Sequence, residues 1–193
     1  LLFPAAAIVA FITMTRGWHR WRELRLFSSS AIFLAIAAPW HILAAWRTPG
    51  FFWAYFINEH INRALGTRLP HDYGALPLWI WWSAHVAWLF PWSFFLPLAL
   101  RELPLSPRAW GKPMDPSQQA RLLLFVWAGV ILLFFTFESG SRTEYYSFGA
   151  WPAMFMLLGL GIAHAEETDQ VGLKPIQQVL AGVSVVMAAV AAY

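Results

Sequence analysis

Six apolar stretches, most of them close to the length that crosses a bilayer, dominate this sequence. A membrane-spanning helix needs about 20 mostly apolar residues, and inside lipid a helix satisfies its own backbone hydrogen bonds. The chain is 59% hydrophobic and only 12% charged, whereas a soluble domain carries about 25% charged residues. We therefore predict an all-α membrane protein, a bundle of about six transmembrane helices. The predicted spans are about 1–15, 27–46, 77–100, 121–137, 145–164 and 176–193.

Both ends of the chain lie within apolar runs. The sequence begins with Leu1 instead of Met and ends with VSVVMAAVAAY, and it lacks the charged start and cleavage site of a signal peptide. We therefore expect 1–193 to be a single transmembrane domain fragment of a longer protein. Because the chain holds no cysteine, disulfides, thiolate metal sites and cysteine nucleophiles are excluded. Proline removes a backbone hydrogen bond, so kinks are expected inside the spans at Pro39, Pro91, Pro97 and Pro152.

The basic residues are divided unevenly between the two sides of the predicted bundle. Nine of the 13 lie in the segments 16–25, 101–121 and 165–175, and four lie in the loops between them. The positive-inside rule assigns the richer side to the cytoplasm, so the loops 47–76 and 138–144 are expected to face outside. The net charge of +3 follows from this sorting and needs no nucleic-acid partner.

The outer loop 47–76 contains the stretch FFWAYFINEHINRALG. Its pattern predicts a helix from Phe51 to Leu65 that lies at the membrane interface, with an apolar stripe and a polar side. Gly66 is expected to end this helix, since glycine readily adopts the left-handed conformation of a helix C-terminus.

Four charged residues of this loop are the first site candidates. Arg63 and the weaker candidate Arg68 are predicted to bind a lipid phosphate, because a guanidinium group matches phosphate oxygens. His60 is predicted to bind a divalent metal, and Glu59 is a weaker candidate as a ligand or base. Adjacent helical residues do not share one face, so any metal needs further ligands from elsewhere. The alternative is a solvated loop with an interfacial anchor.

The second outer loop adds Arg142, Tyr145 and, as a weaker candidate, Tyr146. A cation with two phenols at headgroup depth suits a bound phosphate, and the alternative is an ordinary aromatic belt. Two histidines lie inside predicted spans. His41 is expected at the interface, and His85 is a weak cavity-lining candidate.

The order of these motifs resembles a known family. The stretches PWHILAA, PGFFWAYFINEHINR, PLWIWW and GSRTEYYSFGAWPAMFMLLG are similar to those of the polyprenol-phosphate-sugar-dependent membrane glycosyltransferases. The similar branch includes the aminoarabinose transferase and is related to the protein O-mannosyltransferases, which have a GT-C fold. The resemblance spans about 26–160.

The resemblance implies an enzyme of the bacterial inner membrane that moves a sugar from a polyprenyl-phosphate carrier to a lipid, glycan or protein acceptor on the outer face. It implies a metal at His60 and carrier phosphate at Arg63 and Tyr145, with Arg142 nearby. The family's catalytic carboxylate lies in a first large outer loop that this chain does not contain. No catalytic residue is therefore assigned, and the chain alone is expected to be inactive without the missing N-terminal half.

Two other classes stay open. A polyprenyl-lipid transporter or flippase fragment would use the same basic, aromatic outer surface without catalysis. It would need polar residues or broken helices near the middle of the membrane, where His85 is nearly the sole candidate. A plain membrane scaffold would need no site at all.

Overall fold

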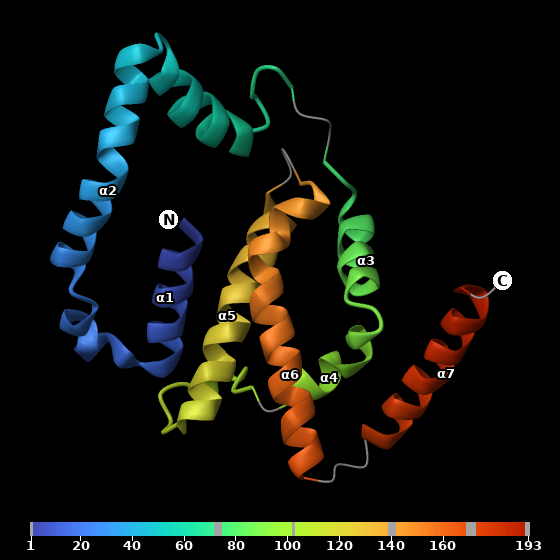
Figure 1. Ribbon diagram of the computed structural model, residues 1–193. Coiled ribbons are helices and arrows are strands. Elements are labelled where there is room, and N and C mark those ends of the chain that lie inside the picture. Colours follow the sequence, from blue (N-terminus) through green and yellow to red (C-terminus); the bar gives the residue numbers. More distant parts are fainter. Residues whose placement is uncertain (1, 72–74, 102, 139–141, 169–172, 192–193) are drawn as a thin grey trace.

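The computed structural model describes residues 2–71, 75–101, 103–138, 142–168 and 173–191. The chain runs up and down in helices joined by turns (Figure 1). The long elements are α1 (Leu2–Thr15), α2 (Leu26–Arg47), α3 (Leu78–Trp88), α5 (Pro116–Phe137), α6 (Trp151–Glu167) and α7 (Leu173–Ala191). The shorter ones are η1 (Gly17–Leu24), η2 (Trp53–Asn62), η3 (Trp92–Phe95), α4 (Leu96–Arg101), η4 (Pro107–Ala109) and η5 (Glu144–Ala150).

In the described residues, three helical stretches are long and apolar enough to cross a membrane: Leu26–Arg47, Pro116–Phe137 and Tyr145–Glu167. The bent pair Leu78–Trp88 and Trp92–Arg101 adds a fourth if it counts as one span. The apolar helices Leu2–Thr15 and Ile176–Ala191 are shorter. These findings confirm an all-α membrane protein.

The packed centre is formed by α5 and α6, with α1 against one side of α5 and α4 against α6. An aspartate capping box starts α5: the Asp115 side chain accepts from Gln118 N, and the Gln118 side chain accepts from Asp115 N. The buried core is aliphatic and aromatic, and it includes Leu122, Ile131, Phe135, Ala153 and Leu157.

The predicted span 77–100 is broken in the structure. Helix α3 ends at Trp88, and the chain turns by 95° before it continues into η3 and α4. Pro91 stands in this break, where it has no N–H to offer a continuing helix. Pro152, by contrast, lies in the first turn of α6, where a missing N–H leaves no gap in the hydrogen bonding.

Close approach holds α4 against α6. A Cβ added to Gly161 would lie 2.7 Å from Ala99 Cα and 2.9 Å from Ala99 N. Two backbones that approach so closely need small residues at the contact. The crossing of Gly161 and Ala99 therefore fixes where the second half of the broken span sits.

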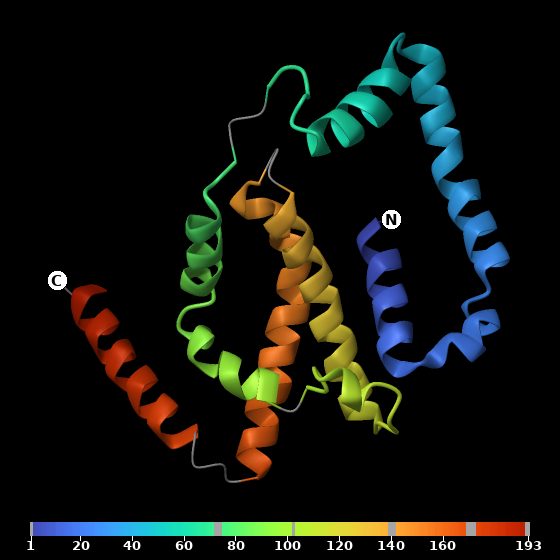
Figure 2. The same ribbon diagram turned by 180° about the vertical axis from the view of Figure 1, so that it is seen from behind.

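The loops gather at two ends of the bundle. In Figures 1 and 2, η2 and η5 lie at one end, and η1 and the turn that holds η4 lie at the other. This is the alternation that the charge pattern predicted. Helix α2 stands apart from the centre, and its membrane-length window has no buried residue.

We predict that Gly161→Ala lowers the thermal stability of the detergent-solubilised chain. The added methyl group meets backbone atoms of α4 rather than a movable side chain, and such overpacking is expected to cost about 1–3 kcal/mol. Gly159→Ala in the same helix is the matched control, because a Cβ there meets nothing within 4 Å. Equal melting temperatures for the two variants would contradict the close crossing.

Candidate functional site

The outer-loop helix forms as predicted, with one difference in its hydrogen bonding. Residues 51–64 are helical, and η2 is a π-helix, which has a wider turn than an α-helix. Gly66 follows it with φ 69°, and Gly66 N–H donates to the Arg63 carbonyl. The predicted helix end at this glycine is therefore confirmed.

Aromatic rings attach this helix to α2. The Phe51 and Tyr55 rings stack with centroids 5.3 Å apart, and Trp40 of α2 meets both rings edge-on. His41, also on α2, lies against the rings of Tyr55 and Phe56. The aromatic run thus anchors the polar residues that follow it.

A buried asparagine shapes the loop beyond the helix. Asn58 Nδ2 donates to the Leu69 carbonyl, and Leu69 N–H donates to Asn58 Oδ1 at 3.0 Å. The side chain thereby pairs with a backbone peptide as a neighbouring strand would, and it is 5% exposed. This pairing folds the segment back onto η2 and brings Arg68 over Glu59. The sequence analysis named no role for Asn58, and its position among other polar residues gave no sign of burial.

Glu59 is held between two arginines. Its carboxylate lies 2.9 Å from Arg63 Nη2 and 2.7 Å from Arg68 Nη2. The hydrogen bond from Arg68 is the main cause that lowers the pKa of Glu59, assisted by the charges of Arg63 and Arg68 and opposed by partial burial. The trio therefore carries one net positive charge at neutral pH.

Arg63 also joins the two outer loops. Its Nη1 donates to the Tyr146 hydroxyl at 3.3 Å, and its guanidinium carbon lies 5.9 Å from the centre of the Tyr146 ring. The two residues are 83 positions apart in sequence. The structure thus brings the NEHINR segment and the R-T-E-Y-Y segment together through Arg63 and Tyr146, while the phosphate site itself stays a prediction.

An open cavity of about 520 Å³ lies beside this junction. One side is polar, and the other is made of apolar side chains from α1 and α5. The lining residues are Leu2, Phe3, Glu59, His60, Arg63, Ala64, Phe134, Phe135, Glu138 and Tyr146. The aromatic wall and Glu138 were not predicted as parts of a site. The one sequence feature that could have indicated Glu138 is its place at the start of an outer loop.

His60 lines the cavity, and one of its ring nitrogens is already hydrogen-bonded to the backbone. Nδ1 lies 2.6 Å from the Tyr55 carbonyl oxygen, five residues earlier, which is the spacing that a π-turn brings together. That nitrogen therefore carries the proton and donates, which leaves Nε2 as the acceptor.

The described residues do not form a metal centre on their own. Among them no three His, Asp or Glu side chains converge on one point, and Glu59 is bound by two arginines. Nε2 of His60 would supply at most a single ligand. The predicted metal at His60 stays a prediction, and we derive no chemical step from it.

Arg142 is placed differently from the other phosphate candidates. Its side chain is buried, and its guanidinium donates to the carbonyls of Phe135, Thr136 and Leu76 at 2.6, 3.0 and 3.1 Å. Leu76 N–H donates back to the Arg142 carbonyl at 2.8 Å. Arg142 thus caps the C-terminus of α5, where main-chain carbonyls lack helical partners, and ties it to the start of α3. It does not line the cavity, so its phosphate-binding role stays a prediction.

Tyr145 belongs to η5, and His85 of α3 contacts the same element. Tyr145 is 53% exposed and packs edge-on against Tyr146. His85 is buried among tryptophans. Its Nδ1 lies 2.7 Å from the Trp81 carbonyl, and its Nε2 contacts the Ser147 hydroxyl. His85 therefore joins α3 to η5. It also lines a second, mostly apolar cavity of about 360 Å³, as predicted for it.

The fold and this site define a class: an integral membrane protein of helices with a charged, aromatic-walled cavity at one end. Curated bacterial relatives agree with it. The undecaprenyl phosphate-alpha-4-amino-4-deoxy-L-arabinose arabinosyl transferase of Erwinia tasmaniensis is 33% identical over 147 residues, which cover 75% of this chain and 24% of that protein. The corresponding transferase 2 of Pseudomonas fluorescens is 29% identical over 168 residues, 84% of this chain and 28% of that protein. That of Aeromonas hydrophila is 30% identical over 148 residues, 75% of this chain and 24% of that protein.

The chain is therefore homologous to a segment of these membrane glycosyltransferases, and the resemblance found in its motifs is confirmed. It spans about a quarter of the length of the curated relatives that it matches. No protein-family model matches the chain. No solved structure matches it either.

We predict that Arg142→Ala and Arg142→Lys both destabilise the chain. Lysine keeps the charge but cannot donate to three carbonyls in the fork geometry of arginine, and lost hydrogen bonds to a buried charge are worth about 1.5–3 kcal/mol each. Thermal unfolding in detergent measures the effect, with the exposed Arg47→Ala as control. A lysine variant as stable as the parent chain would show that charge alone, not capping, is required.

We predict that the 66–71 segment loosens in acid. Because the pKa of Glu59 is lowered in the folded chain, its ion pairs stabilise the loop above the ordinary carboxyl pKa and are lost as pH falls through the lowered value. Hydrogen exchange of 66–71 at pH 7 and below pH 4 measures the change. In Glu59→Gln the exchange should be fast at both values after correction for intrinsic rates. A parent-like pH dependence in that variant would assign the effect to another group.

Proposed function

We propose that this chain is part of an integral-membrane glycosyltransferase that moves a sugar from a polyprenyl-phosphate carrier to an acceptor on the outer face. In this proposal the chain supplies the residues that bind the carrier phosphate and part of the surface that contacts the lipid chain of the carrier. The names of the relatives support the donor class, since they describe transferases of a sugar carried on undecaprenyl phosphate.

The observation that carries the proposal is the two-sided lining of the 520 Å³ cavity. Arg63, His60 and Tyr146 line its polar side, while Phe3 and Phe134 belong to its apolar side. A polyprenyl phosphate has the same division, with an anionic head on an apolar chain. A guanidinium group binds phosphate through paired hydrogen bonds, and the aromatic wall suits the first isoprene units.

The arginine pair around Glu59 suggests how the phosphate is held. Arg68 has further anchors, because its Nη1 donates to the Pro70 carbonyl at 2.9 Å and Asn58 fixes the backbone beside it. Arg68 can therefore keep Glu59 neutralised while Arg63 turns its guanidinium toward phosphate. The Tyr146 hydroxyl is placed to donate to the same anion once Arg63 no longer donates to it. Arg142 acts in this scheme as a positioning residue that holds the η5 side of the site, and Tyr145 stands exposed beside it.

The transfer chemistry needs a group from outside this chain. A carboxylate base would take the proton of the acceptor hydroxyl, and direct displacement at the anomeric carbon would invert its configuration. The lipid phosphate leaves, and the positive charge of Arg63 stabilises the developing anion. This division of labour places the binding cations here and the base in the part of the longer protein that the chain does not include.

The proposed setting is the bacterial inner membrane, with 47–76 and 138–144 on the outer side. It is supported by the gathering of η2 and η5 at one end of the bundle and of the arginine-rich segments at the other (Figure 1). The sorting of arginine and lysine then agrees with the positive-inside rule.

A transporter is the second candidate, and the 95° break between α3 and α4 is the feature that favours it, since broken helices hold substrates in transporters. The neighbouring cavity weakens this reading. It is almost wholly apolar, and both ring nitrogens of its histidine, His85, already contact protein atoms.

Carrier binding tests the proposal directly. The detergent-solubilised chain should bind undecaprenyl phosphate more tightly than undecaprenol, and Arg63→Ala should weaken binding of the phosphate about tenfold, the value of one charge-assisted hydrogen-bond pair. Arg63→Lys should weaken it less, because the charge remains. Arg47→Ala, which removes an exposed cation of the same end, is the matched control.

Three results would count against the assignment. Equal affinity for undecaprenyl phosphate and undecaprenol would show that no phosphate site exists in this chain. Release of sugar from the loaded carrier by residues 1–193 alone would show that the base lies within them, and it would refute the division of labour. Movement of the carrier across vesicle membranes without sugar transfer by the full-length protein would favour the transporter.

A further inference from the structure

The end of the bundle opposite the cavity carries a separate charged surface. There η1 connects α1 to α2. Four exposed arginines lie in or directly beside it: Arg16, Arg20, Arg22 and Arg25. Two tryptophans of the same short segment, Trp18 and Trp21, are 48% and 46% exposed. Nothing in the proposed transfer reaction uses these residues.

Backbone geometry sets this segment across the helix ends. Arg16 and Arg25 flank η1 with φ of 52° and 47°, so the chain turns sharply at each side of it. In Figures 1 and 2, η1 therefore runs between the ends of α1 and α2 instead of continuing either helix. Since α2 is long enough to cross a bilayer, a segment at its end lies at the level of the lipid headgroups.

A second loop extends the surface. Gly111 N–H donates to the Met14 carbonyl at 3.0 Å, and the Arg16 side chain packs closely on Gly111, where an added Cβ would lie 2.8 Å from Arg16 Cγ. This contact brings the exposed Arg108 and Lys112 to the same end as η1. The two loops together carry six basic side chains.

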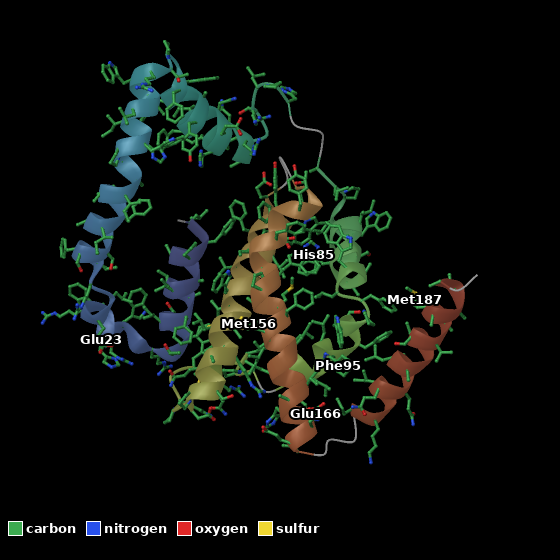
Figure 3. The ribbon with its side chains drawn as sticks, viewed as in Figure 1. Glu23, His85, Phe95, Met156, Glu166 and Met187 are labelled. Atoms are coloured by element: carbon green, nitrogen blue, oxygen red, sulfur yellow. The ribbon has the colours of Figure 1, made fainter. Side chains whose placement is uncertain are left out.

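Few acidic groups face this surface within the described residues. Glu23 is paired with Arg20, and Asp115 caps α5. Glu166 lies at the end of α6, well separated from Glu23 in Figure 3, and Glu167 follows it. The guanidinium carbon of Arg22 lies 5.8 Å from the centre of the Trp21 ring. In the part of the chain that the structure describes, neither Arg22 nor Arg25 forms an ion pair with an acidic side chain.

We propose that η1 and the Arg108–Lys112 turn form a binding surface for the headgroups of anionic phospholipids. Guanidinium groups bind phosphate diesters, and indole rings prefer the headgroup region of a bilayer. A soluble anion would use the cations but would give the exposed tryptophans no partner. The surface lies away from the cavity, so this inference stands apart from the proposed transfer function.

Lipid titration of the whole 193-residue chain in detergent, followed by native mass spectrometry, tests the proposal. Phosphatidylglycerol should bind, whereas phosphatidylcholine and inorganic phosphate should bind at least tenfold more weakly. Arg22→Gln should weaken phosphatidylglycerol binding about fivefold, the effect expected of one basic residue near an anionic surface. Arg22→Lys should retain most of it.

Glu23→Gln separates lipid binding from folding damage. Removing this carboxylate frees the charge of Arg20, so phosphatidylglycerol affinity should rise by up to about fivefold, which a poorly folded variant would not show. Arg47→Gln at the opposite end is the matched control and should leave affinity unchanged.

Three results would overturn the proposal. These are equal binding of phosphatidylglycerol and phosphatidylcholine, displacement of phosphatidylglycerol by millimolar inorganic phosphate, and an equal loss in Arg47→Gln and Arg22→Gln. The second would assign the surface to free anions.

Discussion

The buried guanidinium of Arg142 is the interaction on which the outer end of the structure depends. Its N–H groups donate to two carbonyls that lack helical partners at the end of α5. They also donate to the Leu76 carbonyl, in the chain that enters α3. A charge inside a membrane protein is stable only where such donors and acceptors are matched. Because η5 begins two residues later, the same anchor determines where Tyr146 meets Arg63. Arg142, which the sequence predicted as a phosphate ligand, thus positions the segments that carry the candidate site.

Opposite charges are paired in the candidate site. Glu59 separates two arginines that would otherwise repel each other, and Asn58 fixes the loop that carries one of them. The cavity lining includes Arg63 of this trio together with the carboxylates of Glu59 and Glu138, and its other wall is aromatic. A cation beside an aromatic wall suits the anionic head and the apolar chain of the proposed carrier.

Local sequence patterns predicted the features that depend on local physics. The lengths of the apolar runs predicted α2, α5 and α6. The change from aromatic to polar residues predicted the η2 helix, and Gly66 predicted its end. The burial of Asn58 and Arg142 was out of reach, because it depends on partners 11 and 66 residues away in the chain. The kink expected at Pro91 became a full break for a similar reason. A proline permits a bend, but the contact of Gly161 with Ala99 on another helix decides its direction.

The broken span leaves a short helix on one side of the bundle. Helix α3 has 11 residues and rises only about 16 Å at 1.5 Å per residue, roughly half of a hydrocarbon core of about 30 Å. The bend of 95° directs α4 sideways, so α4 adds little to that height. A hydrophobic helix that is shorter than the hydrocarbon core is accommodated by local thinning of the bilayer. By the same rule, a long-chain lipid beside α3 is expected to meet a thinner bilayer than one beside the full-length helix α5.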